Sequence, residues 1–180
     1  MATSLLKNLT PLLFFVVLSM LISCKGNNGS VQKNNTGEAN VEELYKGYYK
    51  NPQTLDEQQQ NMIIDYAVDN NLNLQRLESG LYMMTVQEGF GPTLRWGEKI
   101  KVDYRGTYLD GTEFDSSYSR GAPYITAVGT TIAGWNEALI RMKSGGKAKV
   151  IVPSRLGYGN KEFAGIPPNS ILVFDIHVLI

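Results

Sequence analysis

Apolar and polar residues alternate with a period of two in several segments of the second half of the chain. Residues 100–108 place apolar side chains and one Gly at even positions and mainly polar side chains at odd positions. The same alternation covers residues 147–152 and 171–180. Asp110-Gly111 suits a tight hairpin turn because both residues tolerate positive φ, and a short strand at 112–115 would follow it. The pattern predicts antiparallel strands with one buried face.

A helical period appears before these strands, in residues 54–71. Thr54 and Glu57 have the spacing of a capping box, and Asn70-Asn71 is a plausible stop. The apolar positions at helical intervals are Leu55, Met62, Ile63, Tyr66 and Ala67. We expect this helix to pack on the main domain; the alternative is a helix that binds a partner or a second copy. A weaker helical stretch covers residues 41–49.

One short helix is predicted between the strands. Trp135, Leu139 and Met142 fall at i, i+4 and i+7, and Gly145-Gly146 follows them as a stop. Antiparallel strands with a single helix are typical of an α+β domain in which the sheet wraps against that helix. This domain is expected to cover residues 81–180, preceded by an N-terminal helical extension, residues 54–80.

The first 24 residues are mostly apolar and nearly free of charge. Lys7 is the only charged residue among the first 24, and residues 11–22 are apolar apart from one Ser. Such a run is too short for a bilayer-spanning helix, which needs about 20 apolar residues. A basic residue followed by a short apolar core is the pattern of a secretory signal peptide, so residues 1–23 are predicted to be one.

Leu21-Ile22-Ser23-Cys24 resembles the lipobox of bacterial lipoproteins, in which the cysteine is lipidated and becomes the first mature residue. The alternative is a cleaved signal peptide with an incidental cysteine. Residues 24–53 would be the lipid anchor and a linker, since the Asn- and Gly-rich residues 25–40 have too little apolar surface to become ordered. The resemblance implies a protein of the bacterial cell envelope that faces the periplasm. Lys25 after the cysteine favours the outer membrane.

The composition argues against several classes of binding site and catalytic site. Equal numbers of basic and acidic residues, 17 each, and the lack of a long basic run argue against a nucleic-acid-binding protein. One His and one Cys supply neither the usual zinc ligands nor a Ser–His–acid or Cys–His catalytic set. His177 stands alone on the polar face of the last predicted strand. Among the nearby carboxylates, Asp103 is expected to face solvent and Asp110 lies in a turn, which disfavours a catalytic carboxylate pair with Glu113 or Asp115.

Aromatic residues are frequent at strand ends and in loops, where the pattern alone indicates core residues. Residues 98–180 also resemble an FKBP-type peptidyl-prolyl cis-trans isomerase domain. The matching segments are Val102-Asp103-Tyr104-Arg105-Gly106, Asp110-Gly111-Thr112-Glu113-Phe114-Asp115-Ser116-Ser117, Ile132-Ala133-Gly134-Trp135, Leu156-Gly157-Tyr158-Gly159 and Ile166-Pro167-Pro168-Asn169-Ser170-Ile171-Leu172-Val173-Phe174-Asp175. The five segments together, in this order and spacing, are far more specific for the family than any single segment. The family fold is a half-wrapped antiparallel sheet around one short helix, in agreement with the periodicity.

The resemblance implies a substrate pocket in which Trp135 is the floor and the walls are Tyr104, Phe114, Tyr124 and Phe174. No metal or cofactor is expected.

The remaining site residues follow from the same resemblance. The backbone N–H of Ile132 would bind a substrate carbonyl, and Ile166 would reach the pocket from a flap. Asp115 and Tyr158 would form its polar rim, and we expect these two and Phe174 to be the catalytic residues.

Departures from the family pattern affect the rim and the flap. They are Thr131, Ala133, Gly165, Asn169 and Tyr124. Arg120 matches a position that steadies the aspartate in some members. We expect these changes to affect tight binding of a macrolide inhibitor more than isomerase activity.

The resemblance therefore implies an isomerase that acts on X-Pro bonds of exported proteins and assists their folding in the cell envelope. The main alternative is a membrane-tethered chaperone or binding module with weak or no isomerase activity, in which the helix of residues 54–71 supplies the interaction surface. A third is an accessory lipoprotein, because similar family lipoproteins belong to gliding-motility systems. Client proteins and oligomeric state leave no pattern in the sequence.

Overall fold

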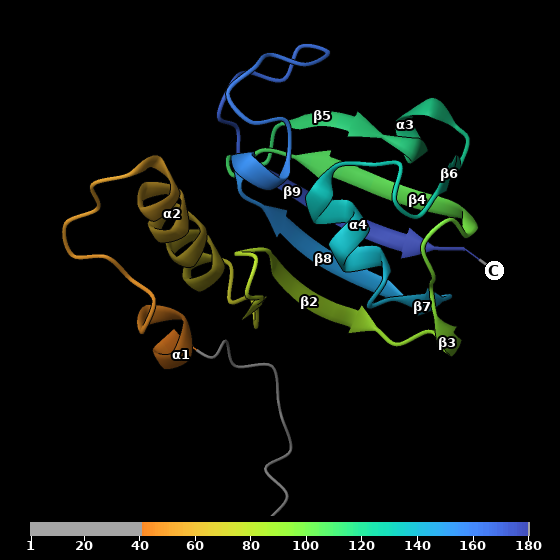
Figure 1. The fold of residues 1–180 in the computed structure, drawn as a ribbon, viewed down its shortest axis with the longest axis horizontal. Helices are drawn as coiled ribbons and strands as arrows, with labels where there is room; N and C mark the ends of the chain where they lie inside the picture. Colours follow the sequence, from red (N-terminus) through yellow and green to blue (C-terminus); the bar gives the residue numbers. More distant parts are fainter. Residues whose placement is uncertain (1–40, 180) are drawn as a thin grey trace, which may run out of the picture. The chain divides into compact units, whose positions relative to one another are not determined.

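The computed structural model describes residues 41–179. Within them, seven strands form one antiparallel sheet in the order β1-β2-β8-β9-β4-β5, with β6 also paired to β4; β3 and β7 form a separate two-stranded sheet (Figure 1). The strands are β1 (Gln75–Arg76), β2 (Tyr82–Gln87), β3 (Phe90–Thr93), β4 (Lys99–Thr107), β5 (Glu113–Ser116), β6 (Tyr124–Ala127), β7 (Lys143–Ser144), β8 (Lys147–Val152) and β9 (Leu172–Val178). The helices are α1 (Val41–Tyr45), α2 (Leu55–Asp69), α3 (Ser117–Arg120), α4 (Ala133–Leu139) and the 3-10 helix η1 (Ser154–Leu156). The predicted α+β class is confirmed.

The main hydrophobic core lies between α4 and one face of the sheet, as Figure 1 shows for the helix. Strand β9 supplies every second residue to this core, as its alternation predicts: Leu172, Phe174, Ile176 and Val178. From α4, Trp135, Ala138 and Leu139 meet them, and each is at most 4% exposed. Full burial of one such large side chain stabilises the fold by about 1.5–3 kcal/mol, so this face of the sheet fixes the position of α4.

The opposite face of the sheet is apolar and buried at one end and charged at the other. At one end, the paired residues Ile151 and Val173 are buried by α2, through Ile63, Ile64 and Ala67. At the other end, the neighbouring pair Lys149 and Asp175 forms an ion pair of 2.5 Å, because no helix covers it. Helix α2 therefore packs on the main domain, which was the favoured prediction for residues 54–71.

Helix α2 begins as the sequence predicts. Thr54 accepts a hydrogen bond from the Glu57 backbone N–H, and the Glu57 side chain accepts one from the Thr54 N–H, so the capping box is formed. The predicted apolar stripe is only partly correct, because Leu55 and Met62 are 43% and 52% exposed. The buried face includes two polar residues in their place, Gln59 and Asn61.

The segments before and after α2 have specific contacts. Helix α1 is shorter than the predicted helical stretch 41–49, and its Leu44 is buried in the same cluster as Ile63. The Asn61 side chain accepts from the Tyr49 N–H at 2.9 Å and donates to the Tyr49 C=O at 2.8 Å. This pair of hydrogen bonds connects the α1–α2 segment to the helix.

The predicted central helix is too long at its C-terminal end. Helix α4 ends at Leu139 and not at Gly145-Gly146, although Met142 is buried as the helical spacing suggested. The Met142 C=O accepts from the Leu94 N–H at 2.9 Å, and Lys143–Ser144 pairs with β3. Extended pairing therefore replaces the last helical turn while the Met142 side chain still reaches the core.

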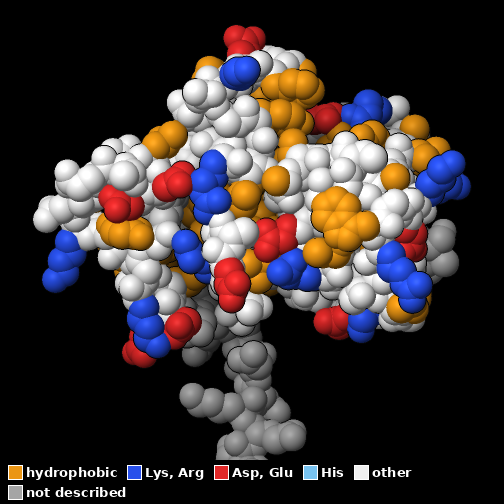
Figure 2. All heavy atoms as spheres, in the orientation of Figure 1, with side chains coloured by type: hydrophobic (Ala, Val, Ile, Leu, Met, Phe, Trp, Pro, Cys, Tyr) orange, Lys and Arg blue, Asp and Glu red, His pale blue; other side chains and the backbone are white. Residues whose placement is uncertain are grey.

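The predicted signal peptide and the lipidation site at Cys24 lie outside the described residues. Among residues 41–179, no helix combines the length and the apolar character needed to span a bilayer. On the face shown in Figure 2, basic and acidic side chains are interspersed over the surface.

Candidate active site

A cluster of aromatic rings lies between α4 and the sheet. The Trp135 ring is at its centre: its centroid lies 5.0 Å from that of Tyr104, 5.3 Å from that of Phe174 and 6.3 Å from that of Tyr124. All three pairs are edge-to-face, the geometry in which a positive ring edge meets a negative ring face. Phe114 extends the cluster through a perpendicular contact with Phe174 at 5.6 Å. The rings therefore fix one another's orientation by direct contact.

These rings line a cavity of about 770 Å³. All nine side chains predicted to form the pocket lie on it: Tyr104, Phe114, Asp115, Tyr124, Ile132, Trp135, Tyr158, Ile166 and Phe174. Arg120 and Thr131, the latter named above among the departures at the rim and flap, line it as well, and so do three residues that the sequence did not assign to the pocket: Thr130, Phe163 and Ala164. The structure thus brings the predicted residues together, while their individual roles stay predictions.

Gly106 on β4 makes the close approach of two pocket rings possible. A Cβ atom at this position would lie 2.7 Å from the Phe114 ring and 3.0 Å from the Phe174 ring. Such distances are shorter than van der Waals contact, so a larger residue would displace one wall. The glycine of the Val102–Gly106 motif therefore has a packing function, which its place in an alternating strand did not reveal.

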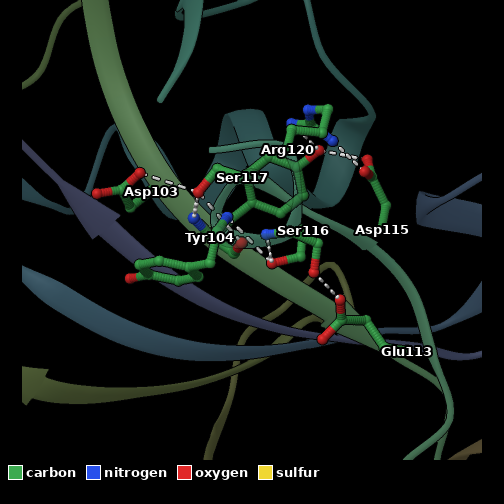
Figure 3. Close-up of polar contacts among 9 residues, drawn as sticks. Asp103, Tyr104, Glu113, Asp115, Ser116, Ser117 and Arg120 are labelled. Carbon is green, nitrogen blue, oxygen red and sulfur yellow. Dashed lines mark hydrogen bonds and ion pairs between the residues drawn. The ribbon is translucent and has the colours of Figure 1, made fainter. Parts of the chain in front are cut away.

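The polar edge of the cavity is a three-residue network (Figure 3). The Tyr104 hydroxyl donates to the Asp115 carboxylate, and Arg120 donates to the same carboxylate and, at 3.0 Å, to the Tyr104 oxygen. The Arg120 guanidinium also lies 5.3 Å from the centroid of the Tyr104 ring. Burial, followed by the hydrogen bond to Asp115, raises the pKa of Tyr104 to about 12. The phenol is therefore neutral at physiological pH and its orientation is fixed.

Helix α3 places Arg120 in this network. Ser116 caps its first turn by accepting from two backbone N–H groups, and Gly121, at φ +71°, ends it in the left-handed conformation that glycine tolerates. Ser117 is buried; its hydroxyl donates to Asp103 at 2.9 Å and accepts from the Tyr104 N–H at 2.9 Å (Figure 3). Asp103 is thus half-buried and hydrogen-bonded, not simply solvent-facing as predicted.

The segment between β8 and β9 forms the opposite rim. The Tyr158 ring stacks on the Phe163 ring at 4.3 Å, and burial raises the pKa of the Tyr158 hydroxyl. Phe163 and Ile166 exchange two backbone hydrogen bonds around a tight turn. Its central residues, Ala164 and Gly165, have φ of +47° and +83°, a turn geometry that glycine adopts freely and alanine rarely. This turn brings Phe163 to the cavity.

Two donors at the floor have no acceptor within residues 41–179. Ile132 precedes α4, and its backbone N–H makes no hydrogen bond there. The Trp135 indole N–H is buried and also unpaired. The Ile132 N–H, on a residue that lines the cavity, is therefore free to donate to an occupant that presents a carbonyl oxygen or another acceptor. The described residues contain no group of three or more His, Cys, Asp or Glu side chains arranged to hold a metal ion.

Comparison with known proteins identifies the family. Residues 91–179 match the model of the FKBP-type peptidyl-prolyl cis-trans isomerases. An FK506-binding protein from Neisseria meningitidis is 43% identical over 103 residues, an alignment that covers 56% of this chain and 94% of that protein. The chain belongs to the FKBP-type peptidyl-prolyl cis-trans isomerase family. The predicted FKBP fold is thereby confirmed.

Longer FKBP-type proteins are similar over part of their length. The Escherichia coli isomerase FkpA is 44% identical over 101 residues, which are 56% of this chain and 37% of FkpA. Its crystal structure superposes with a TM-score of 0.62 and covers 77% of this chain and 62% of that one. A Pseudomonas syringae isomerase structure, 25% identical, gives a TM-score of 0.61 over 73% of this chain and 97% of that one. This chain spans less than half of the length of the curated FkpA proteins that it matches.

Proposed function

We propose that this protein is an active peptidyl-prolyl cis-trans isomerase whose substrates are X-Pro bonds of proline-containing polypeptides. The observation that carries the proposal is the aromatic cavity of about 770 Å³, which has Trp135 at its floor and the polar network of Tyr104, Asp115 and Arg120 at its edge. A proline ring is compact and apolar, so it fits a floor made of aromatic faces and edges. The peptide on either side of it would meet the polar rim.

The reaction needs no proton transfer and no covalent intermediate. Rotation about an X-Pro bond is slow because the planar amide is stabilised by resonance, with a barrier near 18–20 kcal/mol. The twisted amide of the transition state has less charge separation than the planar amide. A dry aromatic cavity therefore disfavours the planar form more, which is differential binding of the transition state. Lowering the barrier by ~5 kcal/mol accelerates the rotation several thousand-fold.

The polar groups would orient the peptide around the rotating bond. The Ile132 N–H and the neutral Tyr158 hydroxyl are hydrogen-bond donors of residues that line the cavity. Asp115 is already engaged by Tyr104 and Arg120, so its role is to fix the Tyr104 ring and to place negative charge near the twisting carbonyl carbon. Phe174 would contact the proline ring from the sheet side.

A protease-coupled assay on a short X-Pro peptide tests the proposal. Wild-type protein at micromolar concentration should accelerate the cis-to-trans phase, and the double variant Phe174→Ala plus Asp115→Ala should abolish most of the acceleration. Tyr45→Phe, an exposed change on α1 outside the cavity, is the control. An unaccelerated phase with folded wild-type protein would refute the proposal, and so would full activity in the double variant. A macrolide that enters the same cavity would inhibit the reaction competitively.

We also propose that the protein acts on exported proteins in the bacterial cell envelope, held by a lipid on Cys24 and facing the periplasm. Support comes from the lipobox-like residues 21–24 after an apolar run, and Lys25 favours the outer membrane. Metabolic labelling with a fatty-acid probe should mark the wild type and not Cys24→Ala. Equal labelling of both proteins would contradict the anchor.

The alternative of a chaperone module that binds clients through residues 54–71 gains no support from α2. Ile63 and Ala67 of its predicted apolar stripe are fully buried against the sheet, and the exposed members Leu55 and Met62 lie apart from that buried face. Deleting the extension would uncover Ile151 and Val173, so loss of chaperone activity in a deletion variant would report on stability as well as on binding.

A further inference from the structure

Gln59 of α2 is a buried polar residue with both ends of its side chain engaged. It is 2% exposed. Its Nε2 donates to the backbone C=O of Asn169 at 2.8 Å, and its Oε1 accepts from the backbone N–H of Ser154 at 2.9 Å. Because a buried amide that loses its partners is strongly destabilising, this geometry requires both backbone groups to stay where they are.

Ser154 and Asn169 are the two ends of the segment that forms the outer rim of the cavity. Residues 154–169 leave β8, carry Tyr158, Phe163, Ala164 and Ile166 to the cavity, and return toward β9. In Figure 1 this segment rises above the sheet, with α2 beside its base. A single side chain from the N-terminal extension therefore connects both ends of a pocket wall.

Further hydrogen bonds link Ser154 and Asn169 to Gly159 inside the rim segment. The Gly159 N–H donates to the Ser154 C=O at 2.8 Å, and the Asn169 N–H donates to the Gly159 C=O at 2.8 Å. Gly159 directly follows Tyr158, so the two residues held by Gln59 fix the backbone next to that ring. Asn169 has φ of +60°, a left-handed conformation that is uncommon for a non-glycine residue and is held here by two hydrogen bonds, one to Gly159 and one from Gln59.

The tip of the rim segment has few attachments, whereas Ile166 is buried in the main core and Leu156 and Tyr158 pack against that core. Residues 160–165 are exposed, and the internal pairing is limited to Phe163 and Ile166. An exposed ion pair of 3.1 Å between Asp56 and Arg155 adds a second link from α2, but exposed pairs contribute little. The position of the rim is therefore set by Gln59 at its base and by the packing of Ile166 in the main core.

We propose that Gln59 is a positioning residue of the pocket, through which the N-terminal extension sets the strength of substrate binding. The inference rests on the proposed isomerase function. Ile166, Phe163 and the ring face of Tyr158 would contact the peptide in its planar and twisted forms alike, so a displaced rim weakens mainly the binding that both states share. Loss of such uniform binding raises KM and leaves kcat nearly unchanged.

Gln59→Met tests this directly, because methionine has a similar length and apolar character but makes neither hydrogen bond. In the full chain, we expect KM for an X-Pro peptide to rise about three- to tenfold, with kcat within about twofold of wild type. Amide hydrogen exchange at Gly159 and Asn169 should accelerate by about tenfold. Gln59→Asn, which keeps the amide but is one methylene shorter, is the milder variant and provides the test if Gln59→Met does not fold.

Asn61→Leu is the matched control. Asn61 lies on the same helix, is buried, and also bonds an N–H and a C=O, but both belong to Tyr49, away from the cavity. This variant should lose stability while KM and rim exchange stay at wild-type values. Equal KM changes in the two variants would overturn the inference, because the effect would then follow stability alone.

The two proposals fail in different ways. Wild-type protein without catalysis would refute the isomerase function, and the exchange at Gly159 and Asn169 would still decide whether Gln59 holds the rim. Wild-type catalysis combined with unchanged KM and unchanged exchange in Gln59→Met would overturn the positioning role and leave the isomerase function intact.

Discussion

Tyr104→Phe removes a hydroxyl whose pKa the fold raises to about 12. The largest cause is burial, and the second is the hydrogen bond to Asp115, while the hydrogen bond from Arg120 acts in the opposite direction. Because the fold favours the protonated phenol, this group contributes stability that is fully present below the unfolded-state pKa near 10. That stability is lost as the pH rises through the folded-state value.

The size of the effect follows from the two pKa values. A difference of two units corresponds to about 2.7 kcal/mol when the group is fully ionised, and linkage gives about 1.4 kcal/mol at pH 11. Between pH 8 and pH 11, wild-type protein should therefore lose about 1.4 kcal/mol more unfolding free energy than Tyr104→Phe. Burial also raises the pKa of Tyr82 and Tyr158, but these groups ionise in both proteins and cancel in the difference.

Urea unfolding followed by tryptophan fluorescence at both pH values measures this difference. Asp115→Asn is the informative third protein: it removes the second cause and leaves burial, so its pH-dependent loss should lie between the losses of the other two. If wild type and Tyr104→Phe lose equal stability between pH 8 and pH 11, the account of a buried, hydrogen-bonded phenol is wrong.

Three further substitutions test the packing. Phe174→Ala removes a ring that is 4% exposed and should lower the unfolding free energy by about 3–5 kcal/mol in urea titrations; a loss below about 1 kcal/mol would contradict its core position. Gly106→Ala places a methyl group 2.7 Å from the Phe114 ring, so we expect at least a tenfold fall in kcat/KM and a stability loss of about 1–3 kcal/mol. Thr54→Ala removes the capping box of α2 and should destabilise the protein by about 1 kcal/mol, whereas Thr54→Ser should retain most of that stability.

Features encoded by a few neighbouring residues were predictable from the sequence. The capping box at Thr54 and Glu57 and the alternation in β4, β8 and β9 depend on local spacing, and the structure has them. The end of α4 depends on which backbone pairs with residues 142–144, and β3 lies some fifty residues earlier in the chain. Long-range pairing of this kind leaves no local pattern.

The same distinction applies to the candidate site. The family motifs include the residues of the floor and walls, which the structure brings to one cavity. Phe163 was not predicted, because it reaches the cavity through a turn in which Ala164 adopts positive φ. Gln59 was also missed, since a polar residue on an amphipathic helix is ordinarily solvent-exposed and its partners lie 95 and 110 residues away.

Core packing holds the floor of the cavity, whereas hydrogen bonds contribute more to the position of its rim. Substitutions at the two places should therefore differ in their effects on stability and on peptide binding. Trp135 and Phe174 belong to the main core, so the floor exists before a substrate arrives and binding requires little reorganisation there. The rim of Tyr158 and Phe163 projects from the sheet; Gln59 holds its base, and Ile166 anchors it in the main core. Substitutions at the floor must therefore change stability and catalysis together, whereas substitutions at the rim and its base can change peptide affinity while the fold remains intact.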